Sequence, residues 1–106
     1  MKLVVDIDGT ICTNTGGLYN DAVPYADRIL YFNNLYDKGH EIHYWTARGS
    51  SSGLDWTELT HKQLSDWGCK YHSLELGKPS YDLWIDDKAF NVEQYFDLVD
   101  HISMTR

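Results

Sequence analysis

The chain is poor in basic residues and has no long hydrophobic run. Its 106 residues include 9 Lys and Arg against 16 Asp and Glu, which gives a formal net charge of −7. Such a surface repels nucleic acid and anionic membranes, so an acidic substrate needs a metal ion or local cations to approach it. No apolar run nears the roughly 20 residues that span a bilayer, and no signal peptide is apparent. The sequence therefore predicts a cytoplasmic protein that binds no membrane and for which nucleic acid is an unfavourable partner.

Cysteine is also scarce. The two cysteines, Cys12 and Cys69, are too few for the disulfide framework of a small secreted domain. Hydrophobic residues make up 42% of the chain and charged residues 24%, an ordinary globular composition that argues against disorder. At this length we expect a single domain over residues 1–106.

Strand-like and helix-like segments alternate along the chain. Leu3–Ile7 has the composition of a central strand, and apolar residues then recur at helical spacing from Asp21, an expected N-cap, to Lys38 before Gly39. The other expected elements are strands at 40–45, 69–75 and 81–87, helices at 56–67 and 91–100, and an edge strand at 101–105. This alternation predicts an α/β protein with a Rossmann-like three-layer fold, in which helices cover both faces of a mainly parallel sheet.

Side chains suited to chemistry follow the ends of the predicted strands. In parallel sheets, ligands bind beyond the carboxyl ends of the strands, so residues far apart in sequence can meet there. The residues in question are Asp6 and Asp8 after the first strand, Thr46 and Arg48 after the second, Lys78 before the fourth, and Asp86 and Asp87 at its end.

The types of these residues indicate phosphoryl transfer. Several carboxylates crowded together need a counter-charge, and Mg²⁺ accepts a few carboxylates while leaving positions for water and phosphate. One aspartate can attack phosphorus to form an aspartyl-phosphate, and a carboxyl two residues away can protonate the leaving alcohol. A lysine and a threonine are suitable donors to the phosphoryl oxygens.

Four short motifs resemble, in order, those of the haloacid dehalogenase (HAD) superfamily of phosphatases: "DIDGT", "YWTAR", "GKP" and "LWIDD". The resemblance covers most of the chain and implies a HAD-like fold with Mg²⁺ as cofactor. It implies the following roles: Asp6 as nucleophile, Asp8 as general acid/base with its backbone carbonyl on the metal, Thr46, Ala47 and Lys78 as phosphate ligands, Asp86 as direct metal ligand, and Asp87 as a metal ligand through water or a partner of Lys78.

The small size and the "TAR" motif also resemble the capsule-polysaccharide-biosynthesis phosphatases of that superfamily. One helix and one strand fill each interval between the motifs, so we expect no cap domain and an open active site. In this superfamily an open site implies a large substrate or a neighbouring subunit that covers it, which makes a homo-oligomer an expectation. The expected substrate is a small phosphorylated metabolite such as a sugar phosphate.

Several alternatives stay open at this point. Arg48 is consistent with substrate contact or with a surface salt bridge, while Tyr19 and Trp56 flank loops near the expected site. A polynucleotide 3′-phosphatase or a nucleotidase would suit the same open fold, although the charge disfavours the first. A phospho-accepting domain and a catalytically inactive binding domain are the alternatives from other classes.

Overall fold

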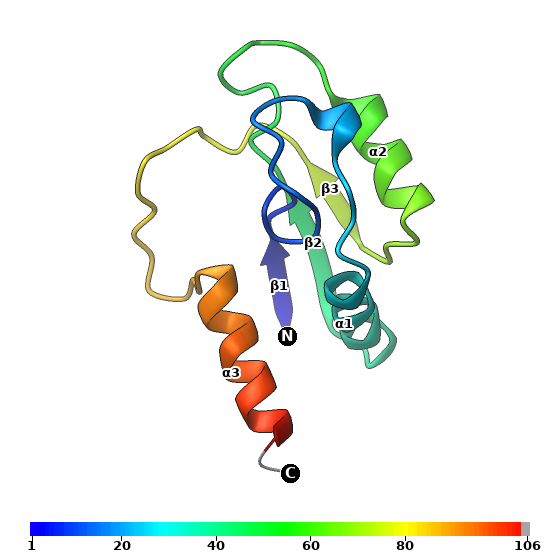
Figure 1. The fold of residues 1–106 in the computed structure, drawn as a ribbon, viewed down its shortest axis with the longest axis vertical. Coiled ribbons are helices and arrows are strands. Elements are labelled where there is room, and N and C mark those ends of the chain that lie inside the picture. Colours follow the sequence, from blue (N-terminus) through cyan, green and yellow to red (C-terminus); the bar gives the residue numbers. More distant parts are fainter. Residues whose placement is uncertain (105–106) are drawn as a thin grey trace.

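A three-stranded parallel sheet organises the chain. The structure is a computed structural model that describes residues 1–104. Its elements are, in chain order, β1 (Lys2–Val5), the 3-10 helix η1 (Tyr19–Asp21), α1 (Ala26–Asp37), β2 (Glu41–Trp45), α2 (Thr57–Asp66), β3 (Ser73–Glu75) and α3 (Val92–Met104) (Figure 1). This order confirms the predicted α/β class. No helix in the described part of the chain is long and apolar enough to cross a membrane.

The strands follow the order β1-β2-β3, with Val5 paired to Tyr44 and Tyr44 paired to Leu74. Strand β1 is therefore an edge strand of the described sheet, and the prediction of a central first strand is wrong. Strand β3 is shorter than expected, and the first helix starts at Ala26 instead of near Asp21, which lies in η1.

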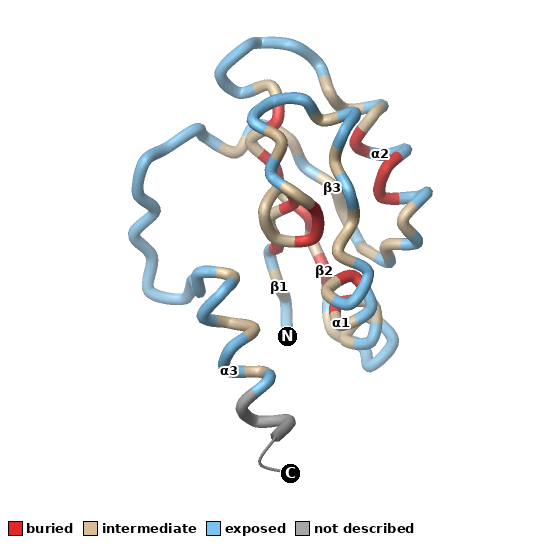
Figure 2. Tube along the Cα trace, in the orientation of Figure 1, coloured by how far each residue is buried: buried red, intermediate tan, exposed pale blue. Residues whose placement is uncertain are grey.

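The core lies on one face of the sheet. Ile42 and Tyr44 are fully buried and alternate along β2 with residues of the opposite face. Ile29 and Phe32 of α1 and Leu64 of α2 belong to the same buried cluster (Figure 2). Both helices thus cover the same face, as two successive right-handed crossovers in one direction require.

The opposite face has no helical layer among the described residues. Val4, which points to that face, is 61% exposed. The last helix packs beside α1 instead, where the ring of Phe96 lies 5.8 Å from that of Phe32 and 5.3 Å from that of Tyr31. An ion pair of 3.2 Å between Arg28 and Glu93 also joins the two helices. Among residues 1–104 the expected three-layer arrangement is therefore not seen, because the partly buried aromatic residues of α3 pack against α1.

Residues 79–91, here called the arm, run outside the sheet between β3 and α3 (Figure 1). The predicted fourth strand at 81–87 is wrong: this segment is irregular and its residues are exposed. The predicted edge strand at 101–105 is also wrong over 101–104, where α3 continues, and Thr105 lies outside the described residues. Extending a helix adds one hydrogen bond per residue, which a strand without a neighbour cannot gain.

Candidate functional site

Asp6 is the first residue after β1, at the carboxyl end of the sheet. The chain then turns sharply through Gly9, whose φ of +81° favours glycine. This turn brings Thr10 back, and its hydroxyl donates a hydrogen bond of 3.3 Å to Asp6 Oδ2. The other oxygen, Oδ1, lies 3.5 Å from Nζ of Lys78. Burial raises the pKa of Asp6, and the charge of Lys78 opposes that rise.

Lys78 reaches Asp6 because its backbone is fixed at the same end of the sheet. Its N–H donates to the carbonyl of Thr46 at 3.1 Å, and its own carbonyl accepts a 2.6 Å hydrogen bond from the Ser50 hydroxyl. The ammonium also lies 5.4 Å from the centre of the Tyr81 ring. The structure therefore brings together Asp6 and Lys78, as the sequence predicted.

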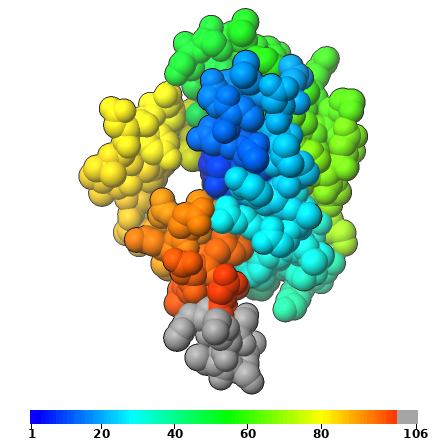
Figure 3. Space-filling model, viewed as in Figure 1, coloured from blue at the N-terminus to red at the C-terminus, as the bar shows by residue number. Residues whose placement is uncertain are grey.

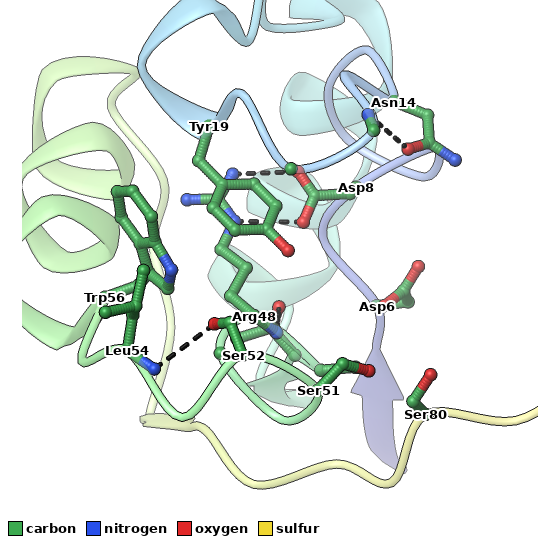
Figure 4. Close-up of a pocket in the computed structure, with 15 residues that line it drawn as sticks. Asp6, Asp8, Asn14, Tyr19, Arg48, Ser51, Ser52, Leu54, Trp56 and Ser80 are labelled. Carbon is green, nitrogen blue, oxygen red and sulfur yellow. Dashed lines mark hydrogen bonds and ion pairs between the residues drawn. The ribbon is translucent and has the colours of Figure 1, made fainter.

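Asp8 is held by Arg48 in a two-point ion pair. Arg48 Nε donates to Asp8 Oδ2 and Nη2 donates to Oδ1, each at 2.9 Å, across 40 residues of sequence. The Asp8 carboxylate points toward this guanidinium (Figure 4). Because Arg48 is only 2% exposed, the surface salt bridge considered from the sequence is wrong. Its partner is the expected acid/base.

Two residues of α2 complete the surroundings of Arg48. Its Nη1 donates to the Thr60 hydroxyl at 3.2 Å and to Gln63 Oε1 at 2.6 Å, while the Tyr19 ring lies 4.7 Å from the guanidinium carbon. Gln63 also donates a 2.7 Å hydrogen bond to the carbonyl of Tyr19. Sequence reasoning did not find the roles of Thr60 and Gln63. The available signal was a glutamine on the apolar face of a predicted helix.

Thr46 links the two ion pairs. It is 1% exposed, and its hydroxyl oxygen accepts a 3.1 Å hydrogen bond from the backbone N–H of Arg48. Its carbonyl accepts the bond from Lys78 already described, and its N–H donates to the carbonyl of Glu75 at 3.0 Å. Thr46 and Ala47 both line a pocket that is also lined by Asp6 and Asp8.

This pocket has a volume of about 560 Å³ and opens between two loops (Figure 4). Tyr19 and Trp56 form its aromatic side, with ring centres 5.0 Å apart and planes at 81°. Asn14, Ser51 and Ser52 supply amide and hydroxyl groups. The two aromatic residues thus lie at the site, as their positions beside the loops predicted.

Cys12 packs behind Asp8 and is fully buried. Its thiol lies 3.5 Å from Asp8 Oδ1, and burial raises its pKa to about 12, with a further rise from the charge of Asp8. A thiol held in the neutral form is a poor nucleophile. Cys12 is therefore a packing residue of the site.

Asp86 and Asp87 do not join this arrangement. Both are exposed on the arm, where Asp86 accepts a 2.8 Å hydrogen bond from the backbone of Lys88, which lowers its pKa. Asp86 lines a wider hollow of about 950 Å³ along β1, and Asp6 and Asp8 line the same hollow. Within the described residues, no group of three or more His, Cys, Asp or Glu side chains is placed to hold a metal ion. In this conformation the residues do not fit a Mg²⁺ site.

The comparisons with known proteins bear on the fold alone. No protein-family model and no curated protein matches the chain. The crystal structure of an MCSG target from Vibrio cholerae is similar, with a TM-score of 0.80 and 21% sequence identity, over 99% of this chain and 98% of that one. Such a likeness supports the arrangement of helices and strands and carries no activity with it.

Proposed function

We propose that the protein is a phosphatase that hydrolyses a phosphate monoester through an aspartyl-phosphate intermediate. The observation that carries the proposal is the pairing of Asp6 with Lys78 beside the pair of Asp8 with Arg48, at the carboxyl ends of parallel strands. Ligands bind at this edge in open α/β sheets. The order of the four sequence motifs supports the same activity and a HAD-like, Rossmann-like fold without a cap.

In the first step of the proposed reaction, an Asp6 oxygen attacks phosphorus and the bond to the leaving oxygen breaks. Asp8 enters this step protonated and gives its proton to that oxygen, so an alcohol leaves. Once Asp8 is ionised, its two oxygens accept the hydrogen bonds from Arg48. In the second step Asp8 takes a proton from water, whose oxygen attacks phosphorus and releases Asp6 and phosphate. Lys78 and Thr46 hold the phosphoryl oxygens during both steps.

Arg48 serves this mechanism as a positioning residue. Both oxygens of Asp8 accept hydrogen bonds from one guanidinium, which Thr60 and Gln63 fix in turn. A planar fork of this kind determines the direction as well as the distance of the carboxylate. Arg48 therefore acts on the leaving oxygen through Asp8.

Mg²⁺ remains part of the proposal as the expected cofactor. When bound, it would neutralise the carboxylates and the phosphoryl oxygens. In the described conformation Asp6 lines the pocket of about 560 Å³, whereas Asp86 and Asp87 do not line it. No step of the mechanism above is therefore assigned to the metal.

The pocket beside the two aspartates suits an uncharged polar leaving group. Arg48 is the one basic residue among those that line it, and Asp8, Thr60 and Gln63 occupy its donors. An aromatic side with amide and hydroxyl groups is suited to a sugar, so we propose a sugar phosphate as substrate. A leaving group with further phosphates would lack a cation there, which disfavours nucleotides and polynucleotides.

A panel of phosphate monoesters, assayed with Mg²⁺ and with EDTA, tests the proposal. Asp6→Asn removes the attacking charge with little change in shape, so hydrolysis should fall by roughly 10⁴ or more. Asp66→Asn, at an exposed ion pair on α2, is the matched control and should retain activity. Near-normal turnover by Asp6→Asn would contradict the covalent mechanism, and no hydrolysis of any ester by the wild-type protein would contradict the function.

A further inference from the structure

The arm combines the sequence of a buried strand with an exposed position. Leu83 is 76% exposed and Ile85 is 88% exposed, and Phe90 at the end of the arm is 63% exposed. Within the described chain, no backbone N–H of residues 79–91 donates to a backbone carbonyl. Exposed apolar side chains in an unpaired segment indicate a surface that another chain segment covers.

Strand β1 offers a matching free edge. It pairs with β2 on one side, and no described strand pairs with its other side. An opening separates it from the arm, visible between the arm, α3 and the rest of the molecule (Figure 3). Lys2, Val4 and Val5 line the hollow at this opening, together with Asp6.

The two segments are complementary in parallel register when Asp86 is placed beside Asp6. The pairs that follow toward the amino end are Ile85 with Val5, Trp84 with Val4, Leu83 with Leu3 and Asp82 with Lys2. Apolar residues thus meet apolar residues on both faces of the sheet. Of the two charged pairs, Asp82 with Lys2 has opposite signs, whereas Asp86 with Asp6 brings two carboxylates together at the site. A shift of one residue would place Ile85 beside Val4, on the uncovered face, and lose this match.

The arm is too short to form the whole register, including the pair of Asp82 with Lys2, on its own β1. In the structure the ring of its Trp84 lies 5.9 Å from that of Trp45 instead. Lys78 is fixed next to Thr46, which follows β2. To place Asp82 beside Lys2 on the free side of β1, the chain must cross two strand spacings and run back along β1 to its amino end. That path is about 16 Å long. Four extended residue steps, from Lys78 to Asp82, span at most about 14 Å.

We infer that the arms are exchanged between two copies of this chain. Each arm pairs with β1 of the other copy as a fourth parallel strand, and Asp86 and Asp87 enter the site formed by Asp6 and Asp8 of that copy. The inference rests on the proposed function and accounts for the absence of Asp86 and Asp87 from the pocket of Asp6 and Asp8 in the single chain. A reciprocal exchange is a closed two-fold arrangement in which both free edges and both arms are used.

Mixing of two inactive variants tests the exchange. In an exchanged dimer of Asp6→Asn with Asp86→Asn chains, one site receives both mutations and the other receives neither. Equal mixtures, unfolded and refolded together, should recover roughly a quarter of wild-type activity, because half of randomly formed dimers are mixed. The matched control mixes Asp6→Asn with Asp8→Asn. Asp6 and Asp8 of any one site come from the same chain. Every site in that mixture therefore carries one of the two mutations and should stay inactive.

Sedimentation gives a second readout that does not depend on activity. The wild-type chain of 12.3 kDa should sediment as a dimer. Leu83→Asp should sediment as a monomer, and it cannot disturb the core because the side chain is exposed. Leu30→Asp, at a residue of α1 that is 59% exposed, is the control and should remain dimeric.

The outcomes separate the two proposals. A wild-type monomer with full activity would overturn the exchange. A dimer whose mixed variants stay inactive would also overturn it, because each arm would then close on its own chain or the copies would meet elsewhere. A wild-type dimer that Leu83→Asp dissociates, but that hydrolyses no phosphate ester, would support the exchange and contradict the phosphatase function.

Discussion

The carboxyl edge of the sheet and the arm carry equally strong sequence motifs but differ in structure. At the edge, Arg48 is 2% exposed and its guanidinium is engaged by three side chains on two segments. On the arm, Ile85 is 88% exposed, and the hydrogen bonds of Asp86 are to residues within two positions of it. The first region is fixed by buried contacts across the fold, whereas the arm is exposed and contacts the sheet through Trp84, whose ring lies 5.9 Å from that of Trp45.

This difference shows what a motif needs in order to become a site. Asp6 and Lys78 meet because β1 and the Thr46 backbone hold both at one edge. The "LWIDD" motif has no paired strand beside it among the described residues, although its composition suits a strand. A functional residue type at the end of a strand-like segment is therefore placed only when that segment has a neighbouring strand.

Amide hydrogen exchange should give the largest contrast between the two regions. Amides of β1 and β2 are released only by extensive unfolding, while those of the arm have no backbone acceptor in the described chain. At concentrations where the protein is monomeric, arm amides should exchange at least on the order of 10³ times faster than those of Ile42 and Tyr44. Comparable protection would mean that the arm is paired within one chain.

Amide exchange of the arm can also be measured with and without Mg²⁺. If Asp86 enters a metal site in the dimer, Mg²⁺ should slow exchange in the arm at high protein concentration. Asp86→Asn should reduce this effect more than Asp87→Asn does. The reverse order would mean that Asp87 is the direct ligand.

Loss of the ion pair between Asp8 and Arg48 should have the next largest effect, which is on the rate of hydrolysis. Asp8→Asn should lower hydrolysis of alkyl phosphates by about 10²–10⁴, with a smaller loss on aryl phosphates, whose leaving groups need little protonation. Arg48→Met should show the same dependence on leaving group, since it acts through Asp8. Assays of kcat on both ester types measure this.

The double variant separates positioning from substrate binding. In the Asp8→Asn background, Arg48→Met should cause little further loss of kcat, because the residue that it positions is already disabled. Additive losses, or a rise in KM with kcat unchanged, would instead assign Arg48 to substrate contact. Unfolding measurements on each variant control for loss of the fold.

The packing of the site loop predicts a smaller effect on stability. Gly49 has a φ of +83°, and a Cβ there would lie 2.1 Å from the carbonyl oxygen of Leu54; Gly53 has a φ of +73° and open space around it. Gly53→Ala should cost about 1–2 kcal/mol for the left-handed backbone alone. Gly49→Ala should cost more, about 2–4 kcal/mol, measured by urea unfolding. Equal costs would mean that the loop relaxes.

The sequence predicted the site residues next to the strand ends but not the buried ion pair behind them. Asp6, Thr46 and Lys78 were found because each follows or precedes an element with clear periodicity, and the structure brings these residues together. The Asp8–Arg48 pair was missed because the partners lie 40 residues apart and a bidentate contact leaves no local pattern.

The fold could be predicted as far as local pattern determines it. Strands β1 and β2 and helices α1 and α2 match the expected segments, with shifted ends. The arm was predicted as a strand because apolar and β-branched residues favour one. Pairing, however, depends on where the chain is held. Lys78 is fixed beside Thr46 at the carboxyl end of the sheet, whereas a parallel strand beside β1 would begin at the amino end. The residue pattern within 81–87 does not show where the chain before it is held.

Thiol reactivity should give the smallest contrast and tests the packing behind Asp8. Burial raises the pKa of Cys12 to about 12 and that of Cys69 to about 11. Because the thiolate is the reactive form, both should be alkylated slowly at pH 8, and Cys12, which is fully buried, more slowly than the partly buried Cys69. Iodoacetamide labelling followed by mass spectrometry measures both rates, and the urea-unfolded protein gives the reference rate for a free thiol. Since Cys12 lies against Asp8, labelling of Cys12 at the unfolded rate would show that the loop between Asp6 and Cys12 opens readily, and the pair of Asp8 with Arg48 could not then hold the carboxylate in place.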